Sequence, residues 1–192
     1  AAHRSSGYRP LLKDYQFLII DEAHKLPETA QQMYGRRLER ADIAEICMLL
    51  EKEKYTHTTA KLRDGFHQLF SAVIQESNAA DGNQCRTKKS DQERLSFFPG
   101  ELSKEALKHC IRLLKKAEDT TGGKIPRWLS NRLGETRELL RLFFSVNRNW
   151  IFFLEFTRKG DPILCAAHRK IAERLEREIW EQGIPSILTS GT

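Results

Sequence analysis

The sequence predicts a mixed α/β fold that is mostly α, with a helical domain inserted into an α/β sheet. Three observations lead to this prediction. An almost wholly apolar segment lies at residues 15–20, apolar stripes at helical spacing fill the middle, and short strand-like segments return near the end. Because the two ends carry the pattern of one sheet and the middle does not, an insertion is the economical arrangement.

Composition is that of an ordinary folded domain. The 192 residues are 40% hydrophobic and 30% charged, which suits one domain or one domain plus a fragment of another. The 32 Lys and Arg exceed the 26 Asp and Glu, and the resulting net charge of +6 permits binding to phosphate backbones without requiring it. No apolar run approaches the length of a membrane span.

The four cysteines are not spaced as metal or disulfide motifs. A secreted disulfide scaffold, or a zinc or iron–sulfur site built from these four alone, is therefore not expected. We expect Cys47, Cys110 and Cys165 to lie in the core as reduced thiols, and Cys85 to lie in a loop.

The first elements are a strand and a helix. Residues 17–20 form a continuous apolar run, which is typical of a strand covered on both faces. A helix is expected from Leu26 to about Tyr34, because Pro27 suits a first helical turn.

Four helices are expected in the middle, and their apolar stripes are interpreted as core. The stripes are Ile43, Ile46, Cys47 and Leu50; Leu62, Phe66, Leu69, Phe70 and Val73; Leu107, Cys110, Ile111 and Leu114; and Leu129, Leu133, Thr136, Leu140 and Phe143, the last opened by Pro126. Residues 77–96 are expected to be a loop, and residues 120–123 a break.

The end of the chain is expected to return to α/β structure. Residues 149–157 and 162–166 predict a hairpin around the turn at 158–161. A helix over 168–180 would place Ile171, Leu175 and Ile179 on one face and end near Gly183. Residues 185–190 then predict another short strand.

Two acids follow the first strand, Asp21 and Glu22. Side chains at the carboxyl end of a parallel strand point into the crevice where open α/β sheets bind ligands. There, one carboxylate can hold Mg²⁺ through water while the next acts on an attacking water as a general base. The alternative is that the acids only place negative charge at the start of the next helix. His24 alone is uninformative.

The last residues form a turn rich in hydroxyl groups. This turn comprises Thr189, Ser190, Gly191 and Thr192. It could be an ordinary turn, or it could form a hydrogen-bonding relay at the same sheet edge as Asp21 and Glu22. By itself the segment favours the ordinary turn.

Together the two segments resemble helicase motifs. Leu-Ile-Ile-Asp-Glu-Ala-His at 18–24 resembles the Walker B segment, motif II (DEAH), and Ile-Leu-Thr-Ser-Gly-Thr at 187–192 resembles motif III. The family commonly has Ala where this chain has Gly191. The long connection between the motifs resembles that of XPD/DinG-like superfamily 2 DNA helicases, in which a mostly helical Arch domain is inserted into a RecA-like motor domain.

The resemblance implies a division into domains and a set of roles. Residues 1–36 would be a motor-domain piece, 37–148 the Arch domain, and 149–192 the returning hairpin, helix and strand of the motor domain. Asp21 would help hold Mg²⁺ through water, Glu22 would activate water for hydrolysis of ATP, and His24 with the turn at 189–192 would couple hydrolysis to DNA movement. Family members often carry an iron–sulfur cluster, but its ligands would lie outside this chain.

The resemblance also implies partners and a location. These are single-stranded DNA, traversed 5′ to 3′ and enclosed with the help of the Arch domain, and the remainder of the helicase motor. No membrane and no obligate homo-oligomer are expected, and the location would be the bacterial cytoplasm or nucleoid. We expect the chain to be an internal piece of a longer protein. Because the chain contains no Gly-x-x-x-x-Gly-Lys-Ser/Thr loop, we expect it alone neither to hydrolyse ATP nor to unwind DNA.

Two groups of basic residues are candidate DNA contacts. The first comprises Lys124, Arg127, Trp128 and Arg132, cations with one aromatic near a helix start, and the second comprises Arg86, Lys88 and Lys89. For the first group the alternative is a solvated helix face with Trp128 in the core.

Two other functions remain open. The chain could be a helical module that binds a protein partner without nucleotide chemistry, or part of an RNA helicase with a late insertion. The helicase hypothesis requires the strands at 17–20 and 187–189 to neighbour each other in one sheet, with Asp21 and Thr189 at the same edge. The interaction module has no such requirement.

Overall fold

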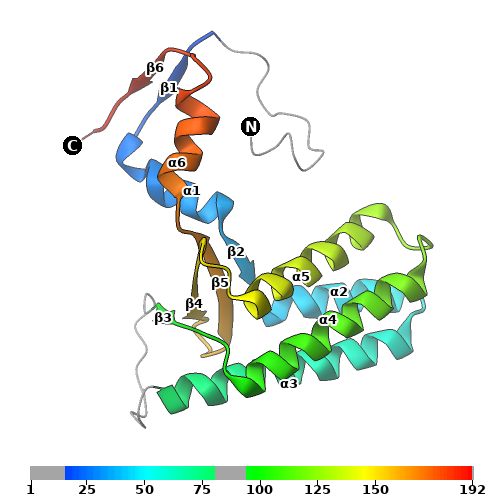
Figure 1. The fold of residues 1–192 in the computed structure, drawn as a ribbon. Coiled ribbons are helices and arrows are strands. Elements are labelled where there is room, and N and C mark those ends of the chain that lie inside the picture. Colours follow the sequence, from blue (N-terminus) through cyan, green and yellow to red (C-terminus); the bar gives the residue numbers. More distant parts are fainter. Residues whose placement is uncertain (1–15, 81–93, 192) are drawn as a thin grey trace. The chain divides into compact units, whose positions relative to one another are not determined.

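A computed structural model describes residues 16–80 and 94–191, which fold as a mixed and mostly helical α/β protein (Figure 1). This confirms the coarser part of the predicted fold class, a mixed and mostly α fold. The described chain divides into two compact units. Unit 1 contains the residues up to Gly35 and those from Ala167 onward, and unit 2 is Arg36–Ala166.

Unit 1 is built on two short parallel strands. Strand β1 (Leu18–Ile20) pairs with β6 (Ser186–Leu188) so that Ile19 lies opposite Ile187. After β1 come a turn of 3₁₀ helix, η1 (Ala23–Lys25), and helix α1 (Leu26–Tyr34), which begins as predicted with Pro in its first turn. The predicted strands and their place in one sheet are therefore confirmed, whereas the expected cover on both faces of the first strand is not, since Ile19 is 57% exposed in the described structure.

The returning helix of unit 1 departs from the regular α-helix expected over 168–180. Helix α6 (Ile171–Leu175) continues into a π-helical turn, η2 (Glu176–Trp180). The Tyr34 hydroxyl donates a hydrogen bond to the Glu178 carboxylate, and the Arg174 guanidinium lies 4.4 Å from the centre of the Tyr34 ring. Burial and the neighbouring Glu178 raise the pKa of Tyr34 to about 12, so the hydroxyl keeps its proton at neutral pH.

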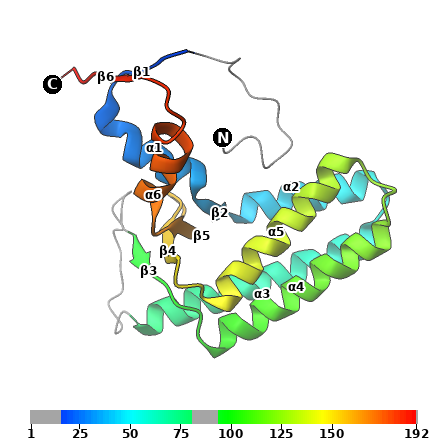
Figure 2. The ribbon, with the colours of Figure 1, turned by 45° about the horizontal axis from the view of Figure 1, so that its top comes forward.

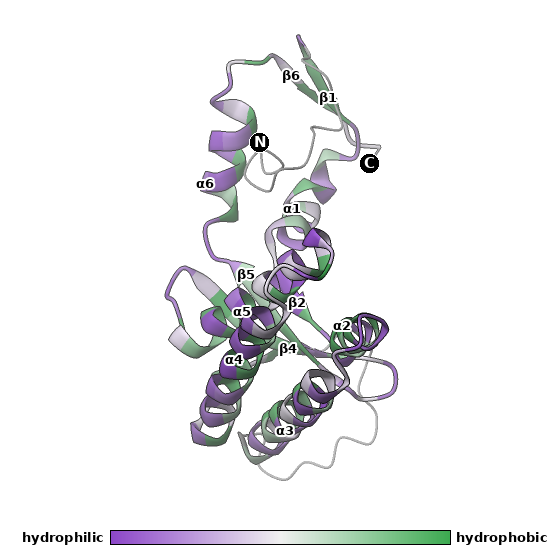
Figure 3. Cartoon of the chain, turned by 90° about the vertical axis from the view of Figure 1, so that its right-hand side faces the viewer, coloured by the Kyte–Doolittle hydropathy of each residue, from purple (hydrophilic) through white to green (hydrophobic). Residues whose placement is uncertain are grey.

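Unit 2 contains the four predicted helices, and their apolar stripes form its core. These are α2 (Arg40–Lys52), α3 (Thr56–Ala80), α4 (Glu101–Thr121) and α5 (Arg127–Ser145), with α3 packed against α2 and α4, and α4 against α5 (Figures 1 and 2). The helices carry hydrophilic and hydrophobic residues on different faces (Figure 3). Within residues 16–80 and 94–191, no helix has both the length and the apolar character needed to cross a bilayer.

A four-stranded sheet completes unit 2. Its strands are β2 (Arg36–Leu38), β3 (Leu95–Ser96), β4 (Trp150–Phe156) and β5 (Pro162–His168), in the order β2-β5-β4-β3. β4 and β5 are the predicted hairpin, and Gly160 adopts a φ of 82° in the turn between them. β2 runs antiparallel to β5, and Arg36 pairs with Ala166.

The second predicted domain boundary is displaced. The hairpin was expected to belong with residues 149–192, but the division falls after Ala166 and leaves β4 and most of β5 in unit 2. The reason is packing, since Phe152 and Leu154 are buried in the core that the helices share. The Phe152 ring lies 5.0 Å from that of Phe143 on α5, measured between ring centres.

The predicted bounds of the loop over 77–96 are wrong at both ends. Helix α3 continues to Ala80, and β3 occupies residues 95 and 96 because Leu95 pairs with Leu154. Residues 81–93 lie outside the described part of the chain.

Candidate functional site

The ends of β1 and β6 bring the two chemically suggestive segments of unit 1 together. Asp21 follows β1 and Thr189 follows β6, and parallel pairing puts both at the same edge of the sheet. The Thr189 hydroxyl donates a hydrogen bond of 2.7 Å to Asp21 Oδ1. The backbone amide of Thr189 donates to the carbonyl of Ile20 at 3.0 Å, and that of Ala23 donates to the carbonyl of Thr189 at 2.9 Å. The predicted meeting of the two segments is therefore confirmed.

Asp21 is held as an ionised carboxylate. The hydrogen bond from Thr189, followed by one from the backbone amide of Glu22 at 2.9 Å, lowers the pKa of Asp21. Both bonds go to Oδ1, and Oδ2 accepts no hydrogen bond from any described residue. An exposed carboxylate with one fixed and one available oxygen can act as an acceptor for water or a hydrated cation.

Glu22 is held in an unusual backbone conformation. Its φ of 51° and ψ of 43° lie in the left-handed region, which a residue with a side chain adopts at some cost in energy. Its Oε2 lies 3.3 Å from His24 Nδ1. Its Oε1 is only 2.8 Å from the point where a Cβ on Gly191 would lie. The glycine in the second segment thus leaves the space that the Glu22 carboxylate occupies.

His24 links the two segments a second time. Its Nδ1 lies 3.0 Å from the hydroxyl oxygen of Ser190, besides its approach to Glu22. One ring nitrogen is therefore shared between a hydroxyl on one segment and a carboxylate on the other. Of the predicted turn, Thr192 lies outside the described residues.

The carboxylates of Asp21 and Glu22 have the donor chemistry that Mg²⁺ prefers. Mg²⁺ keeps several of its waters and is held in proteins by one or two carboxylates together with phosphate oxygens of the substrate. In the described segments no group of three or more His, Cys, Asp or Glu side chains forms a ready-made metal cage. Two adjacent carboxylates, one of them fixed by Thr189, fit a loosely held hydrated ion.

The predicted DNA contacts on and just before α5 separate into two kinds. Lys124, Arg127 and Trp128 are exposed, and Trp128 retains 54% of its surface, so the alternative that places Trp128 in the core is wrong. Arg132 instead forms ion pairs with Glu45 at 2.7 Å and Asp42 at 3.4 Å. Its guanidinium therefore links α5 to α2.

The second basic group, Arg86, Lys88 and Lys89, lies outside the described residues. Arg94, just after it, is tied to the sheet of unit 2. Its guanidinium lies 3.0 Å from the Glu155 carboxylate and 5.2 Å from the centre of the Phe153 ring.

The cysteines are core residues, as predicted, within the described chain. Cys47, Cys110 and Cys165 are buried and free. Burial raises the pKa of Cys110 and of Cys165 to about 12, which keeps both thiols protonated and unreactive. Cys85 lies outside the described residues.

Several contacts in the site carried no signal in the sequence. Nothing in the spacing indicates that Glu22 approaches Gly191, or that Tyr34 pairs with Glu178 across unit 1. Both depend on how distant segments meet. The one related signal in the sequence is Gly191, because the family that the chain resembles commonly has Ala at this position.

No protein-family model matches the chain, and a search of curated proteins finds none similar to it. The assignment of function therefore depends on the geometry above and on the two motif-like segments.

Proposed function

We propose that the chain is a segment of an ATP-dependent 5′–3′ DNA helicase of the XPD/DinG kind. Unit 1 would be part of the RecA-like motor domain, and unit 2 would correspond to the Arch domain that helps enclose single-stranded DNA. We place the intact protein where its substrate is, in the bacterial cytoplasm or nucleoid.

One observation supports this proposal above all others. Two segments at opposite ends of the described chain form adjacent parallel strands, and the side chains that follow them, Asp21 and Thr189, are hydrogen-bonded. Nucleotides bind to open α/β sheets at the carboxyl ends of the strands. A helicase needs this juxtaposition, whereas a helical interaction module does not.

Each residue at this edge has a role that its environment suits. Asp21 would hold hydrated Mg²⁺, whose charge would offset that of the ATP phosphates. Glu22 would accept a proton from the attacking water. His24, placed between Glu22 and Ser190, would make the position of the Glu22 carboxylate depend on the turn that follows β6.

The surface of unit 1 supports the remainder of the motor as a partner. Phe17, Ile19, Ile187 and Leu188 on or beside the two strands each expose more than half of their surface, at 61%, 57%, 55% and 52%. Both strands appear as hydrophobic segments in Figure 3. Two paired strands are marginal by themselves in water, and apolar strands of parallel sheets are normally covered on both faces. Further strands and helices of a motor domain would provide that cover.

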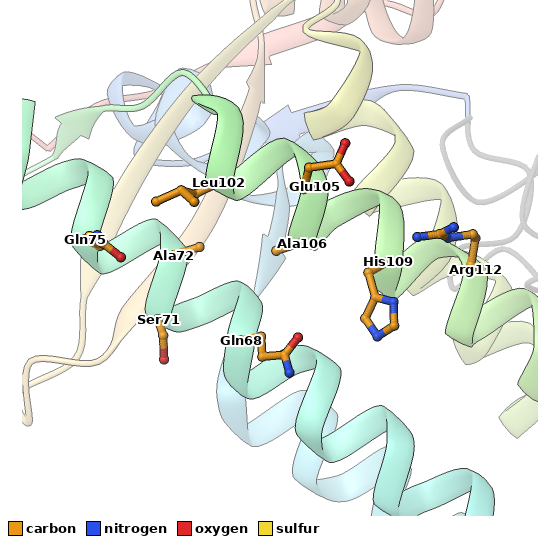
Figure 4. A pocket seen from close by; sticks show the side chains of 9 residues that line it. All are labelled: Gln68, Ser71, Ala72, Gln75, Leu102, Glu105, Ala106, His109 and Arg112. Carbon is orange, nitrogen blue, oxygen red and sulfur yellow. The ribbon is translucent and has the colours of Figure 1, made fainter.

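An interaction module remains the second candidate because of a groove in unit 2. This shallow groove of about 510 Å³ runs between α3 and α4 (Figure 4). Ala72 and Ala106 lie between the helices, and Leu102 at one end is 51% exposed. The remaining lining side chains are polar: Gln68, Ser71, Gln75, Glu105, His109 and Arg112. The groove favours a docking function without explaining the contacts of Asp21, Glu22 and His24.

Turnover by the intact parent protein tests the proposal directly. We expect Glu22→Gln to lower kcat for ATP by about 10²- to 10⁴-fold, because removal of a general base costs that much. ATP binding and the fold should be retained. Glu28→Gln, an exposed acid in the first turn of α1, is the matched control and should leave kcat unchanged.

Undiminished ATP hydrolysis and unwinding by Glu22→Gln would contradict the proposal. Stimulation by RNA in place of DNA would shift the assignment to an RNA helicase with a late insertion. DNA-stimulated ATPase activity of the 192-residue chain alone would contradict the expectation that this segment is inactive without the rest of the motor.

A further inference from the structure

Trp128 on α5 exposes 54% of its surface, although tryptophan is the largest apolar side chain. Trp150 of the same unit, by contrast, packs against the core. A single exposed apolar residue needs no explanation by itself. The surroundings of Trp128 are what distinguish it.

The backbone around Trp128 is fixed. The connection from α4 to α5 turns at Gly122, with a φ of 48°, and is anchored by Ile125, which is 5% exposed. Leu129, which is 1% exposed, occupies the core position on the first turn of α5. Since successive helical residues point about 100° apart, burial of Leu129 turns Trp128 outward. The ring is therefore presented on a turn anchored to the core at Ile125 and Leu129, and such anchoring lowers the entropic cost of binding.

The charge beside the ring is positive, and no described acid forms an ion pair with it. Lys124 and Arg127 are both exposed, and neither forms an ion pair with another described residue. The acids at the end of α4 already have cationic partners, because Asp119 lies 2.7 Å from Lys115 and Glu118 lies 2.6 Å from Arg137 on α5. The first turn of α5 contains no acidic residue.

We infer that Trp128, with Lys124 and Arg127 just before it in the chain, forms a stacking site for a base of single-stranded DNA. The choice of DNA rests on the proposed function. Single-strand sites combine aromatic platforms with cations that follow the phosphates. A duplex keeps its bases stacked on one another and offers no free base to an indole ring. Arg132 is excluded from this site because Glu45 and Asp42 hold its guanidinium.

Binding of a fluorescently labelled oligothymidylate of about 12 nucleotides to the 192-residue chain tests the inference. Trp128→Ala should weaken binding roughly tenfold, because stacking on an aromatic ring contributes about that factor per base, and Trp128→Phe should restore part of it. Arg148→Gln, an exposed cation beyond the other end of α5, is the control for charge and should leave the affinity nearly unchanged.

The salt dependence of DNA affinity distinguishes the contribution of the two cations from that of the Trp128 ring. Lys124→Gln and Arg127→Gln should each reduce the slope of log K against log salt by about 0.7, whereas Trp128→Ala should not change it. Equal affinity of wild type and Trp128→Ala would overturn the inference, as would failure of the chain to bind the oligonucleotide. Equal, Trp128-dependent binding of an acidic peptide would also overturn it in favour of a protein ligand. Because no ATP is present, these results are independent of the turnover of Glu22→Gln.

Discussion

Unit 2 has a core of large apolar side chains sealed from solvent, whereas the apolar side chains of unit 1 remain largely exposed. Phe70, Phe143 and Leu140 of unit 2 retain at most 1% of their surface. Among the described residues of unit 1, only Ala30 and Ile171 are buried apolar residues. Unit 1 is joined instead by polar contacts between its two chain segments, such as Thr189 with Asp21.

The difference indicates that the two units depend on different parts of the protein. Unit 2 contains its own core, and apolar burial is the dominant stabilising contribution to folding. Unit 1 places the hydrogen-bonded side chains of Asp21 and Thr189 at a strand edge but has little core of its own. We therefore expect core substitutions to act on stability in unit 2, and polar substitutions to act on activity in unit 1.

The largest effect should come from truncating the core of unit 2. Phe143→Ala removes a fully buried ring that packs on Phe152, and should lower the free energy of unfolding by about 3–5 kcal/mol. Ile187→Ala in unit 1 should change it by less than about 0.5 kcal/mol, because Ile187 is already 55% exposed. Urea denaturation of both variants measures the contrast. Similar losses of unfolding free energy in the two variants would contradict the contrast between the units, because Ile187 would then contribute as much to stability as Phe143.

The second-largest effect should come from removing the Thr189 hydroxyl, which is hydrogen-bonded to Asp21. Thr189→Val keeps the shape of the side chain but removes the hydrogen bond to Asp21. If Asp21 holds Mg²⁺ as proposed, Thr189 orients a metal-binding carboxylate, and loss of such a group typically costs about 10- to 100-fold in activity or metal affinity, so kcat of the intact parent should fall by that factor. Thr136→Val in unit 2, whose hydroxyl bonds only to the carbonyl of Arg132, is the control and should not alter kcat. Equal effects of the two would refute a special role for Thr189.

A smaller effect should follow from removing the charge at the start of α4. One oxygen of Glu76 accepts hydrogen bonds from the amides of Leu102 and Ser103, at 2.9 and 3.2 Å, and the other from that of Gly100, at 2.9 Å. Burial opposes ionisation, but these bonds outweigh it and lower the pKa of Glu76. Glu76→Gln should therefore cost about 1 kcal/mol at neutral pH, in the range of a lost helix cap.

The pH dependence of this effect has a definite sign. A carboxylate with a lowered pKa stabilises the folded state fully above its unfolded value near 4.5, and this contribution is lost as the pH falls through the folded-state pKa. The stability difference between wild type and Glu76→Gln should therefore shrink as the pH falls below about 4.5. A difference that persists unchanged at lower pH would show that the carboxylate charge is not involved.

The smallest effect should come from Gly191→Ala. The added Cβ would lie 2.8 Å from Glu22 Oε1, so the carboxylate must move, but it is the flexible end of a side chain. We expect kcat of the intact parent to fall a few-fold, with little change in KM for ATP, because Glu22, the proposed general base, is displaced while ATP binding is not affected. Gly134→Ala on α5, where a Cβ makes only an ordinary contact of 3.6 Å with Glu118, should leave kcat unchanged. No change in kcat for Gly191→Ala would show that Glu22 does not depend on this space.

The long helices and the first strand could be predicted because their signals are local. Leu50, Leu69, Leu114 and Leu140 repeat with their neighbours at helical spacing, and each is fully buried. The acids after β1 were found for the same reason, since a continuous apolar run ends at Asp21.

What could not be predicted depends on contacts between distant segments. β2 and β3 contain three residues and two, and each exists because a longer strand offers it hydrogen bonds. Trp128 belongs to an amphipathic helix, yet it lies outside the buried stripe, which Leu129 and Leu133 occupy. The approach of Glu22 to Gly191 likewise requires the two halves of unit 1 to be in place.

The pairing of Arg36 with Ala166 brings the two ends of unit 2 together, so that unit 2 could be excised as a cassette. These are the first and last residues of unit 2, and they lie directly opposite each other on antiparallel strands. Residues paired in this way have Cα atoms only about 4.5–5.5 Å apart. A short turn could therefore reconnect Gly35 to Ala167 after excision of unit 2, without stretching the chain. The same geometry would allow the whole cassette to be transplanted into a surface loop of an unrelated carrier protein.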